Sequence, residues 1–172
     1  MTFWNFFFNN KKTNSTKNTS TKILIENLNE SRQQLDIYYS TNKDINLYDL
    51  EQLCDAVGWV KRPIKKVKIA IENSFLIICI FHYKENKKNL IGFARATSDE
   101  SFNATIWDVV IHPDFQGKGI GKALMQETIK QLRYHDISTI TLFADPEVIQ
   151  FYKRIGFITD PDGVKGMFWY PI

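Results

Sequence analysis

The stretch Asp114–Met125, DFQGKGIGKALM, places three glycines and two lysines between a predicted strand and a predicted helix. The strand is NATIWDVVI at 103–111, and the helix runs from about Gly119 to Tyr134 with apolar residues at helical spacing. At such a junction the first-turn amides of the helix have no partner within the helix, and the helix dipole adds positive charge. Glycines let an anion approach the backbone. The stretch therefore predicts a phosphate-binding turn.

Spacing excludes two common phosphate-binding families. A P-loop needs a glycine five residues before the Gly-Lys pair and a Ser or Thr after it, whereas Gln116 and Ala123 occupy those places. A dinucleotide-binding fingerprint needs G-x-G-x-x-G within a parallel βαβ unit. Here the glycines are spaced G-x-G-x-G and follow strands predicted to be antiparallel, so neither family fits.

Three further helices are predicted from caps and apolar periodicity. Asn46 is the predicted N-cap of a helix that Gly58 ends, and Pro63 stands in the first turn of a second helix that reaches Ser74. A third helix, 146–156, is capped by Asp145 and ends at Gly156.

The strands surround these helices, and a polar turn, KENKKN, joins two of them into a hairpin. Strands are predicted at 35–40, 75–83, 89–97, 103–111, 138–144, 157–159 and 166–171. The whole predicts an α/β domain with a mixed, mostly antiparallel central sheet flanked by about four helices.

Size and composition narrow the function classes. The chain has 172 residues, of which 44% are hydrophobic, which suits one globular domain. Its longest apolar run, FLIICIF at 75–81, is far shorter than a membrane span, so no transmembrane segment is expected. Cys54 and Cys79 lack metal-ligand or disulfide spacing, so we expect buried thiols in a reducing compartment and no metal site. A net charge of +3 suits an anionic ligand but falls short of a nucleic-acid-binding surface.

The first residues differ from the remainder. The aromatic start MTFWNFFF precedes a polar, Lys-rich stretch without periodicity, and this composition predicts a disordered extension over residues 1–22. It resembles neither a secretory signal nor a transit peptide. We expect residues 23–172 to form the folded domain.

Three features in fixed order carry a resemblance. They are a strand ending in VVIHP, the motif Q-x-x-G-x-G at Gln116, Gly119 and Gly121, and FYKRIGF some thirty residues later. From roughly Leu35 onward the chain resembles the GNAT superfamily of N-acetyltransferases. The core WDVVIHPDFQGKGIG and the ending DPDGVKGMFWYP are similar to its plastid and cyanobacterial branch, which includes plant-type serotonin acetyltransferases.

The resemblance implies acetyl-coenzyme A as co-substrate and assigns residues to it. Its pyrophosphate would lie on the loop Gln116, Gly117, Lys118, Gly119, Ile120, Gly121 and Lys122. Backbone amides of Val109, Val110 and Ile111 would hold the pantetheine arm and polarise the acetyl carbonyl, although the same side chains suit an ordinary core. Asp145 stands where many relatives carry an asparagine, which puts in question the amide contact to the cofactor arm.

Acetyl transfer needs an uncharged amine and a protonated leaving group. The resemblance assigns Tyr152 as the acid that protonates the departing thiolate; the alternative is a core aromatic. Asp108 is the first candidate for the base, and His112 on the same strand is the second. The alternative is that both residues have structural roles only: Asp108 would hydrogen-bond to a neighbouring backbone group, and His112 would begin the loop before Pro113.

The sequence thus predicts an acetyl-CoA-dependent N-acetyltransferase in which the amine attacks directly in a ternary complex, with Asp108 or ordered water as base. Its acceptor is an arylalkylamine such as serotonin or a protein lysine or N-terminal amine, with Trp59 and Phe168 as candidate pocket aromatics. The alternative is a non-catalytic acetyl-CoA-binding regulatory module. We expect no nucleic-acid partner, a monomer or homodimer, and the plastid stroma, with a bacterial-type cytoplasm as alternative.

Overall fold

The computed structural model describes residues 21–30 and 33–170, so residues 1–20 of the predicted disordered extension lie outside the described part. The elements follow one another as β1 (Lys22–Glu30), β2 (Gln33–Ser40), α1 (Leu47–Ala56), α2 (Ile64–Glu72), β3 (Leu76–Lys84), β4 (Lys87–Ser98), β5 (Asn103–Ile111), α3 (Ile120–Tyr134), β6 (Thr139–Leu142) and α4 (Ile149–Arg154). Short 3₁₀ turns occupy 113–115, 146–148 and 161–163.

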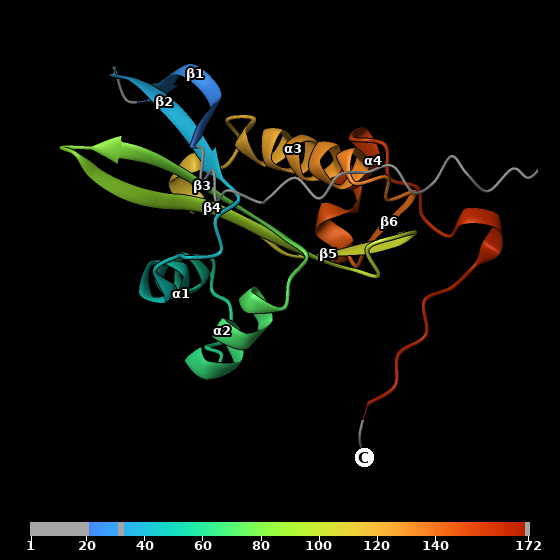
Figure 1. Ribbon diagram of the computed structural model, residues 1–172. Helices are drawn as coiled ribbons and strands as arrows, with labels where there is room; N and C mark the ends of the chain where they lie inside the picture. Colours follow the sequence, from blue (N-terminus) through green and yellow to red (C-terminus); the bar gives the residue numbers. More distant parts are fainter. Residues whose placement is uncertain (1–20, 31–32, 171–172) are drawn as a thin grey trace, which may run out of the picture.

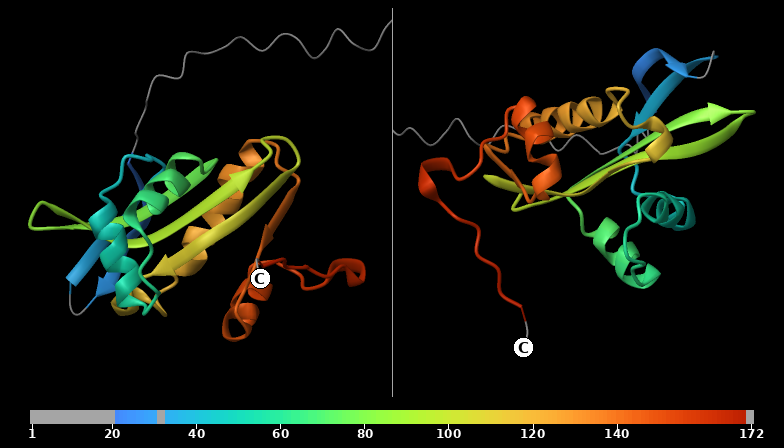
Figure 2. Two further views of the ribbon diagram at one scale, coloured as in Figure 1. Left: turned by 90° about the horizontal axis from the view of Figure 1, so that it is seen from below. Right: turned by 180° about the vertical axis from the view of Figure 1, so that it is seen from behind.

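The six strands form one sheet in the spatial order of the sequence, β1-β2-β3-β4-β5-β6. Every neighbouring pair is antiparallel except β5 and β6, which run parallel. Helices α1 and α2 cover one face of the sheet, and α3 and α4 lie on the other (Figures 1 and 2). The predicted mixed, mostly antiparallel sheet with about four helices is confirmed.

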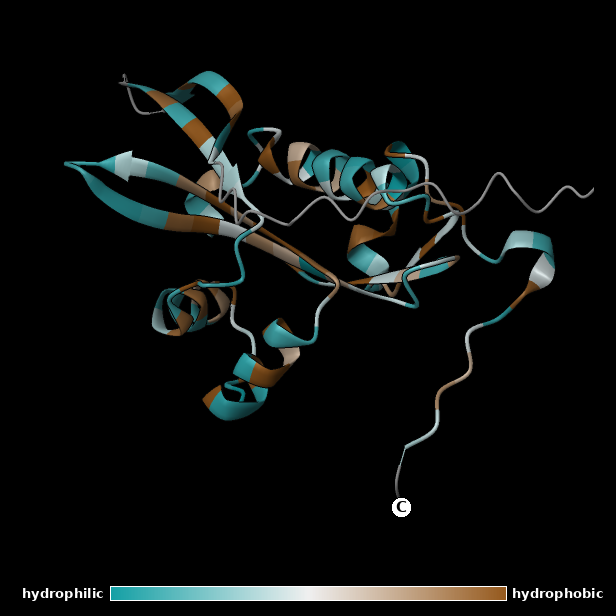
Figure 3. Ribbon diagram, viewed as in Figure 1, coloured by the Kyte–Doolittle hydropathy of each residue, from teal (hydrophilic) through white to brown (hydrophobic). Residues whose placement is uncertain are grey.

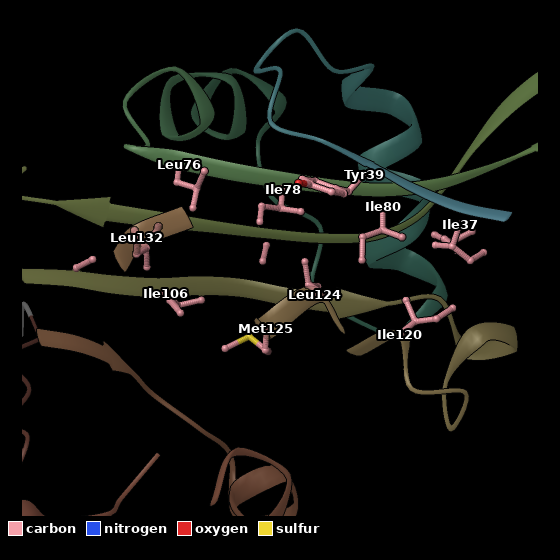
Figure 4. Close-up of a cluster of buried hydrophobic side chains, with 14 of the residues drawn as sticks. Ile37, Tyr39, Leu76, Ile78, Ile80, Ile106, Ile120, Leu124, Met125 and Leu132 are labelled. Carbon is pink, nitrogen blue, oxygen red and sulfur yellow. The ribbon is translucent and has the colours of Figure 1, made fainter. Parts of the chain in front are cut away.

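The central strand β3 packs against helices on both faces. Leu76, Ile78 and Ile80 belong to the cluster that contains the apolar face of α3 (Figure 4). The alternate residues Ile77 and Cys79 belong to a second cluster with α1 and α2. Because successive strand side chains point to opposite faces, covering both faces produces the uninterrupted apolar run in the sequence. Each fully buried Leu or Ile contributes about 1.5–3 kcal/mol.

The β3–β4 hairpin is longer than predicted. Its turn consists of Glu85 and Asn86, whose φ angles of 50° and 64° match the type I′ turn favoured by tight hairpins. The lysines assigned to a six-residue turn instead extend both strands. This end of the hairpin is hydrophilic and projects beyond the helices (Figure 3), so hydropathy does not mark it as strand.

The helix caps are confirmed in part. Asn46 Oδ1 accepts a hydrogen bond from the Tyr48 amide at 3.0 Å, as expected of the N-cap of α1. Pro63 lies immediately before Ile64, the first residue of α2. Asp145 makes no capping hydrogen bond with its side chain, and the helix predicted at 146–156 is divided into a 3₁₀ turn and α4.

Strand predictions were wrong at both ends of the domain. Strand β1 was not expected, because its polar residues and two register irregularities hide the alternation of an edge strand. The strands predicted at 157–159 and 166–171 do not form within the described range 157–170. That segment pairs with no strand of the described sheet. Its residues Met167 and Trp169 are 95% and 83% exposed.

Candidate functional site

A cleft opens where β5 and β6 separate. The two strands pair from Asn103–Thr139 to Ile106–Leu142 and no further. Beyond that point the cleft has a volume of about 550 Å³. Its walls are the α1–α2 loop (Val57, Trp59, Val60 and Arg62), β5 from Ile106 to Ile111, Gln116, Tyr152, and the segment after β6 (Leu142–Asp145 and Val148).

The edge of β5 that faces this cleft has no neighbouring strand after Ile106 in the described sheet. The His112 amide donates to the Ile91 carbonyl of β4 at 2.8 Å. Because backbone groups of successive strand residues point to opposite edges, the Ile111 amide and carbonyl face the open edge. Gln116 Nε2 donates to that carbonyl at 2.9 Å, which leaves the Ile111 amide as a donor in the cleft wall.

The glycine-rich turn takes a conformation that suits glycine. Gly117 and Gly119 have φ angles of 73° and 82°, in the left-handed region. A Cβ at either position would meet no atom within 4 Å, so backbone conformation rather than space restricts these positions. Gly119 is the N-cap of the 15-residue helix α3 and supplies no capping side chain, so first-turn amides remain available.

Other predicted loop residues have different surroundings. Lys118 Nζ donates to the Asp114 carbonyl and lies 5.4 Å from the centre of the Phe115 ring. Lys122 is exposed, and Ile120 is fully buried in the core, so Ile120 can offer a ligand its backbone alone. A Cβ on Gly121 would lie 3.7 Å from Ile111 and from Phe151, which is ordinary contact.

Tyr152 lines the cleft from α4 and is half-buried. Its ring packs edge-on against Phe151 and Phe157, with centroids 5.0 and 6.0 Å away. Burial, with a smaller contribution from the charge of Asp145, raises the pKa of the Tyr152 phenol above its usual range. The phenol therefore keeps its proton near neutral pH and can donate it.

Asp108 lies at a bulge in β5. Phe93 pairs with Val110 and Arg95 with Trp107, so two residues of β5 stand opposite one residue of β4. Asp108 itself has a φ of 54°. Its Oδ1 accepts from Arg62 Nη1 at 3.0 Å, and its Oδ2 accepts from Arg95 Nε. Both carboxylate oxygens are therefore engaged by guanidinium groups.

His112 and Asp145 differ in their relation to the cleft. His112 is not among its lining residues; its Nδ1 accepts from the Asp114 amide at 3.3 Å, at the start of the following 3₁₀ turn. Asp145 does line the cleft, where it is exposed beside Tyr152.

Sequence reasoning missed Arg62, and no local pattern marks it. It lies in a loop 46 residues before its partner Asp108. Of the two aromatics suggested for an acceptor pocket, Trp59 lines the cleft, whereas Phe168 packs against the cleft residue Phe143 at 5.0 Å. Trp107 completes the aromatic wall, with its ring 5.6 Å from that of Phe143.

An elongated, anionic cofactor fits these features. The open edge of β5 offers a backbone donor, and the left-handed glycine turn at the start of α3 leaves amides for a diphosphate. Among the described residues, no three His, Cys, Asp or Glu side chains gather as a metal site would require. The described helices are all too short or too polar to cross a bilayer.

The acetyltransferase (GNAT) family matches residues 45–157. The chain is 61% identical over 183 residues to N-acetyltransferase ycf52 of Gracilaria tenuistipitata var. liui, with full coverage of both chains. It is 46% identical to histone acetyltransferase TAP1 of Glycine max, covering 87% of this chain and 68% of that one. It is 45% identical to the chloroplastic GCN5-related N-acetyltransferase 2 of Arabidopsis thaliana, covering 79% and 59%.

A solved structure shows the same fold. The GNAT-family acetyltransferase SP0256 from Streptococcus pneumoniae superposes with a TM-score of 0.65 at 22% identity, covering 78% of this chain and 98% of that one. GNAT proteins generally use acetyl-CoA as the acetyl donor. The cleft, the order of its motifs and these relatives agree, and the chain belongs to the GNAT family of acetyl-transferring enzymes, in its plastid and cyanobacterial branch.

Proposed function

We propose that this enzyme transfers the acetyl group of acetyl-CoA to an amine of a protein, by direct attack within a ternary complex. The observation that carries the proposal is the cleft between β5 and β6, which an unpaired strand edge, Gln116 at the start of the glycine-rich turn and a protonated tyrosine line together. A protein acceptor is supported by the relative named a histone acetyltransferase. The plastid stroma is supported by the relative named chloroplastic.

The proposed function assigns a role in binding or catalysis to each of these features. The loop from Gln116 to Lys122 would bind the diphosphate through its backbone amides and the α3 dipole. Within the stretch Val109–Ile111, the backbone groups that face the open edge would hold the pantetheine arm and orient the thioester carbonyl, with the Ile111 amide as donor; the Val110 amide faces β4 instead. Acetyl-CoA supplies the activated acetyl group. Tyr152 would give its phenolic proton to the departing sulfur.

The amine needs a proton acceptor, and we assign that task to ordered water. Asp108 is less suited because both its oxygens already accept from arginines. Protein N-terminal amines have pKa values of about 7.7–8.0, so a substantial fraction is neutral near physiological pH, whereas lysine at about 10.4 is almost wholly charged. Asp108 and His112 as bases stay predictions.

An arylalkylamine is the second candidate acceptor. The aromatic side chains Trp59, Trp107 and Phe143 line the cleft and could hold an indole or phenyl ring. Both acceptor classes would use the same cofactor site, so cofactor binding cannot distinguish them. The rate at which each amine is acetylated can.

The test is thiol release from acetyl-CoA with an amine panel: serotonin, tryptamine, polyamines, and peptides bearing a free N-terminus or a lysine. We expect turnover of peptide amines, and a loss of about 10²–10⁴-fold in kcat for Tyr152→Phe because a positioned acid contributes that much. Acetyl-CoA affinity, measured by calorimetry, should not change.

Tyr134→Phe is the matched control, since Tyr134 is 82% exposed on α3, and it should keep full activity. If acetyl-CoA binds while no amine turns over, the chain is a cofactor-binding regulatory module instead.

A further inference from the structure

Arg62 is the basic residue among the described cleft-lining residues. It lies on the loop between α1 and α2, opposite β5, and its side chain is 42% exposed. The other charged residues in the lining are Asp108 and Asp145. A guanidinium in the wall of this cleft would repel the ammonium form of an amine acceptor. Its presence there therefore calls for a chemical role.

The position of this guanidinium is fixed from two sides. Its Nη1 donates to Asp108 Oδ1 at 3.0 Å, and its Cζ lies 6.0 Å from the centre of the Trp59 ring. Asp108 is itself held by Arg95, whose side chain is 16% exposed. An arginine carries five N–H donors in a rigid fork, so the bond to Asp108 leaves further donors on a partly exposed group.

These donors line the same cleft as Val109, Ile111 and Tyr152, which form the proposed reaction centre. Asp108 directly precedes Val109, the first residue of the stretch whose amides would bind the acetyl end of the cofactor. An amine that attacks there brings its own nearest substituents close to Arg62. For a protein N-terminus, the nearest backbone hydrogen-bond acceptor is the oxygen of the first peptide carbonyl. The nitrogen of an arylalkylamine has no oxygen nearby, and a lysine side chain keeps its carbonyl at the far end.

We infer that Arg62 binds the acceptor by donating a hydrogen bond to the first peptide carbonyl of a protein N-terminus. Asp108 and Arg95 act as positioning residues that hold the guanidinium in place. This inference rests on the proposed function and specifies its substrate, because it makes α-amines the preferred acceptors and gives the cationic group at the cleft a ligand.

The test compares two acceptors in wild type and Arg62→Met. One is a peptide with a free N-terminus; the other is its (E)-alkene isostere, in which a trans C=C bond replaces the first peptide bond, so that the shape is kept while the carbonyl oxygen and the N–H are both lost. A hydrogen bond from a charged donor is worth about 1.5–3 kcal/mol. We therefore expect Arg62→Met to lower kcat/KM for the peptide by about 10- to 100-fold, mainly through KM, and to change that for the isostere by less than about twofold.

Lys61→Met is the matched control. Lys61 is the preceding cation in the chain, is 67% exposed and faces Glu51 and Asp55 of α1. It should leave both acceptors unaffected. Calorimetry with acetyl-CoA shows whether Arg62→Met preserves the folded cofactor site, and its affinity should match that of wild type.

Equal losses on the peptide and the isostere would overturn the inference and make Arg62 a purely structural link between the loop and β5. Efficient acetylation of lysine or arylalkylamines, but not of peptide N-termini, would also overturn it while leaving the acetyltransferase intact. If no amine turns over, the proposed function fails. In that case the affinity of the peptide, measured by calorimetry, tests the inference separately. It should weaken at least tenfold in Arg62→Met, and an unchanged affinity would overturn the inference.

Discussion

Asp108 combines an unusual backbone with an unusual set of partners. Its φ of 54° lies in the left-handed region, which aspartate tolerates better than most residues with a β-carbon. The bulge that produces this angle turns the carboxylate toward Arg62 and Arg95. The same residue that the sequence suggested as a base is thus placed as a link between the α1–α2 loop, β4 and β5.

Replacing Asp108 with Asn tests these two roles. The substitution leaves the half-buried Arg95 guanidinium without a charged partner, so we expect the free energy of unfolding in urea to fall by roughly 2 kcal/mol. The pH profile of kcat/KM should keep its acidic limb, because that limb reports ionisation of the amine. An Asp108→Asn variant of normal stability whose acidic limb has vanished would instead identify Asp108 as the base.

At the scale of elements, the turn before α3 shows how a local pattern becomes a binding feature. Gly119 has a left-handed backbone and open space around its missing Cβ. An alanine there would fit sterically but strain the turn by about 1–2 kcal/mol. We expect Gly119→Ala to weaken acetyl-CoA binding in calorimetry by at least about fivefold, because relief of this strain would redirect the amides.

The control for this variant is Gly58→Ala. Gly58 follows α1, has a similar φ of 78° and likewise has no atom within 4 Å of its missing Cβ. It should lose similar stability and retain acetyl-CoA affinity. Equal loss of cofactor affinity in both variants would mean that general destabilisation, not the geometry of the turn, governs binding.

Elements coded by neighbouring residues were predictable from the sequence. The turn at 116–122 and the Asn46 cap depend on residues within one or two helical turns, so the sequence alone is enough to recognise them. The Arg62–Asp108 contact depends on a loop meeting a bulged strand and has no periodic signature. The segment 157–170 was mispredicted for a related reason: its apolar residues suit a strand, but a strand also needs a partner edge.

At the scale of the whole molecule, a polar link joins the sheet to α3 through an apolar core. Tyr39 of β2 is 5% exposed among Ile and Leu side chains (Figure 4). Its hydroxyl donates to Glu127 Oε1 of α3 at 2.7 Å, and Gln131 Nε2 donates to the same oxygen at 2.6 Å. The buried glutamate is therefore stabilised by one partner on its own helix and by another on β2, 88 residues earlier in the chain.

Because of this link, the free energy of unfolding should change with pH in the alkaline range. Burial first, and then the hydrogen bond and charge of Glu127, raises the pKa of Tyr39 to about 12, against an ordinary value of about 10. Between these values the folded state binds the proton that the unfolded chain has lost. The stabilisation is thus fully present below pH 10 and is lost as pH rises toward 12, by up to about 1.4 kcal/mol per pH unit.

Tyr39→Phe should remove this dependence. Near neutral pH the variant should be less stable by about 1–3 kcal/mol, because Glu127 loses a buried donor. Chemical unfolding from pH 8 to 11.5 should then show the two stability curves converging above pH 10, whereas Tyr134→Phe, at an exposed site, should follow wild type throughout. Parallel curves for wild type and Tyr39→Phe would show that Tyr39 titrates normally, and the link between β2 and α3 would not govern alkaline unfolding.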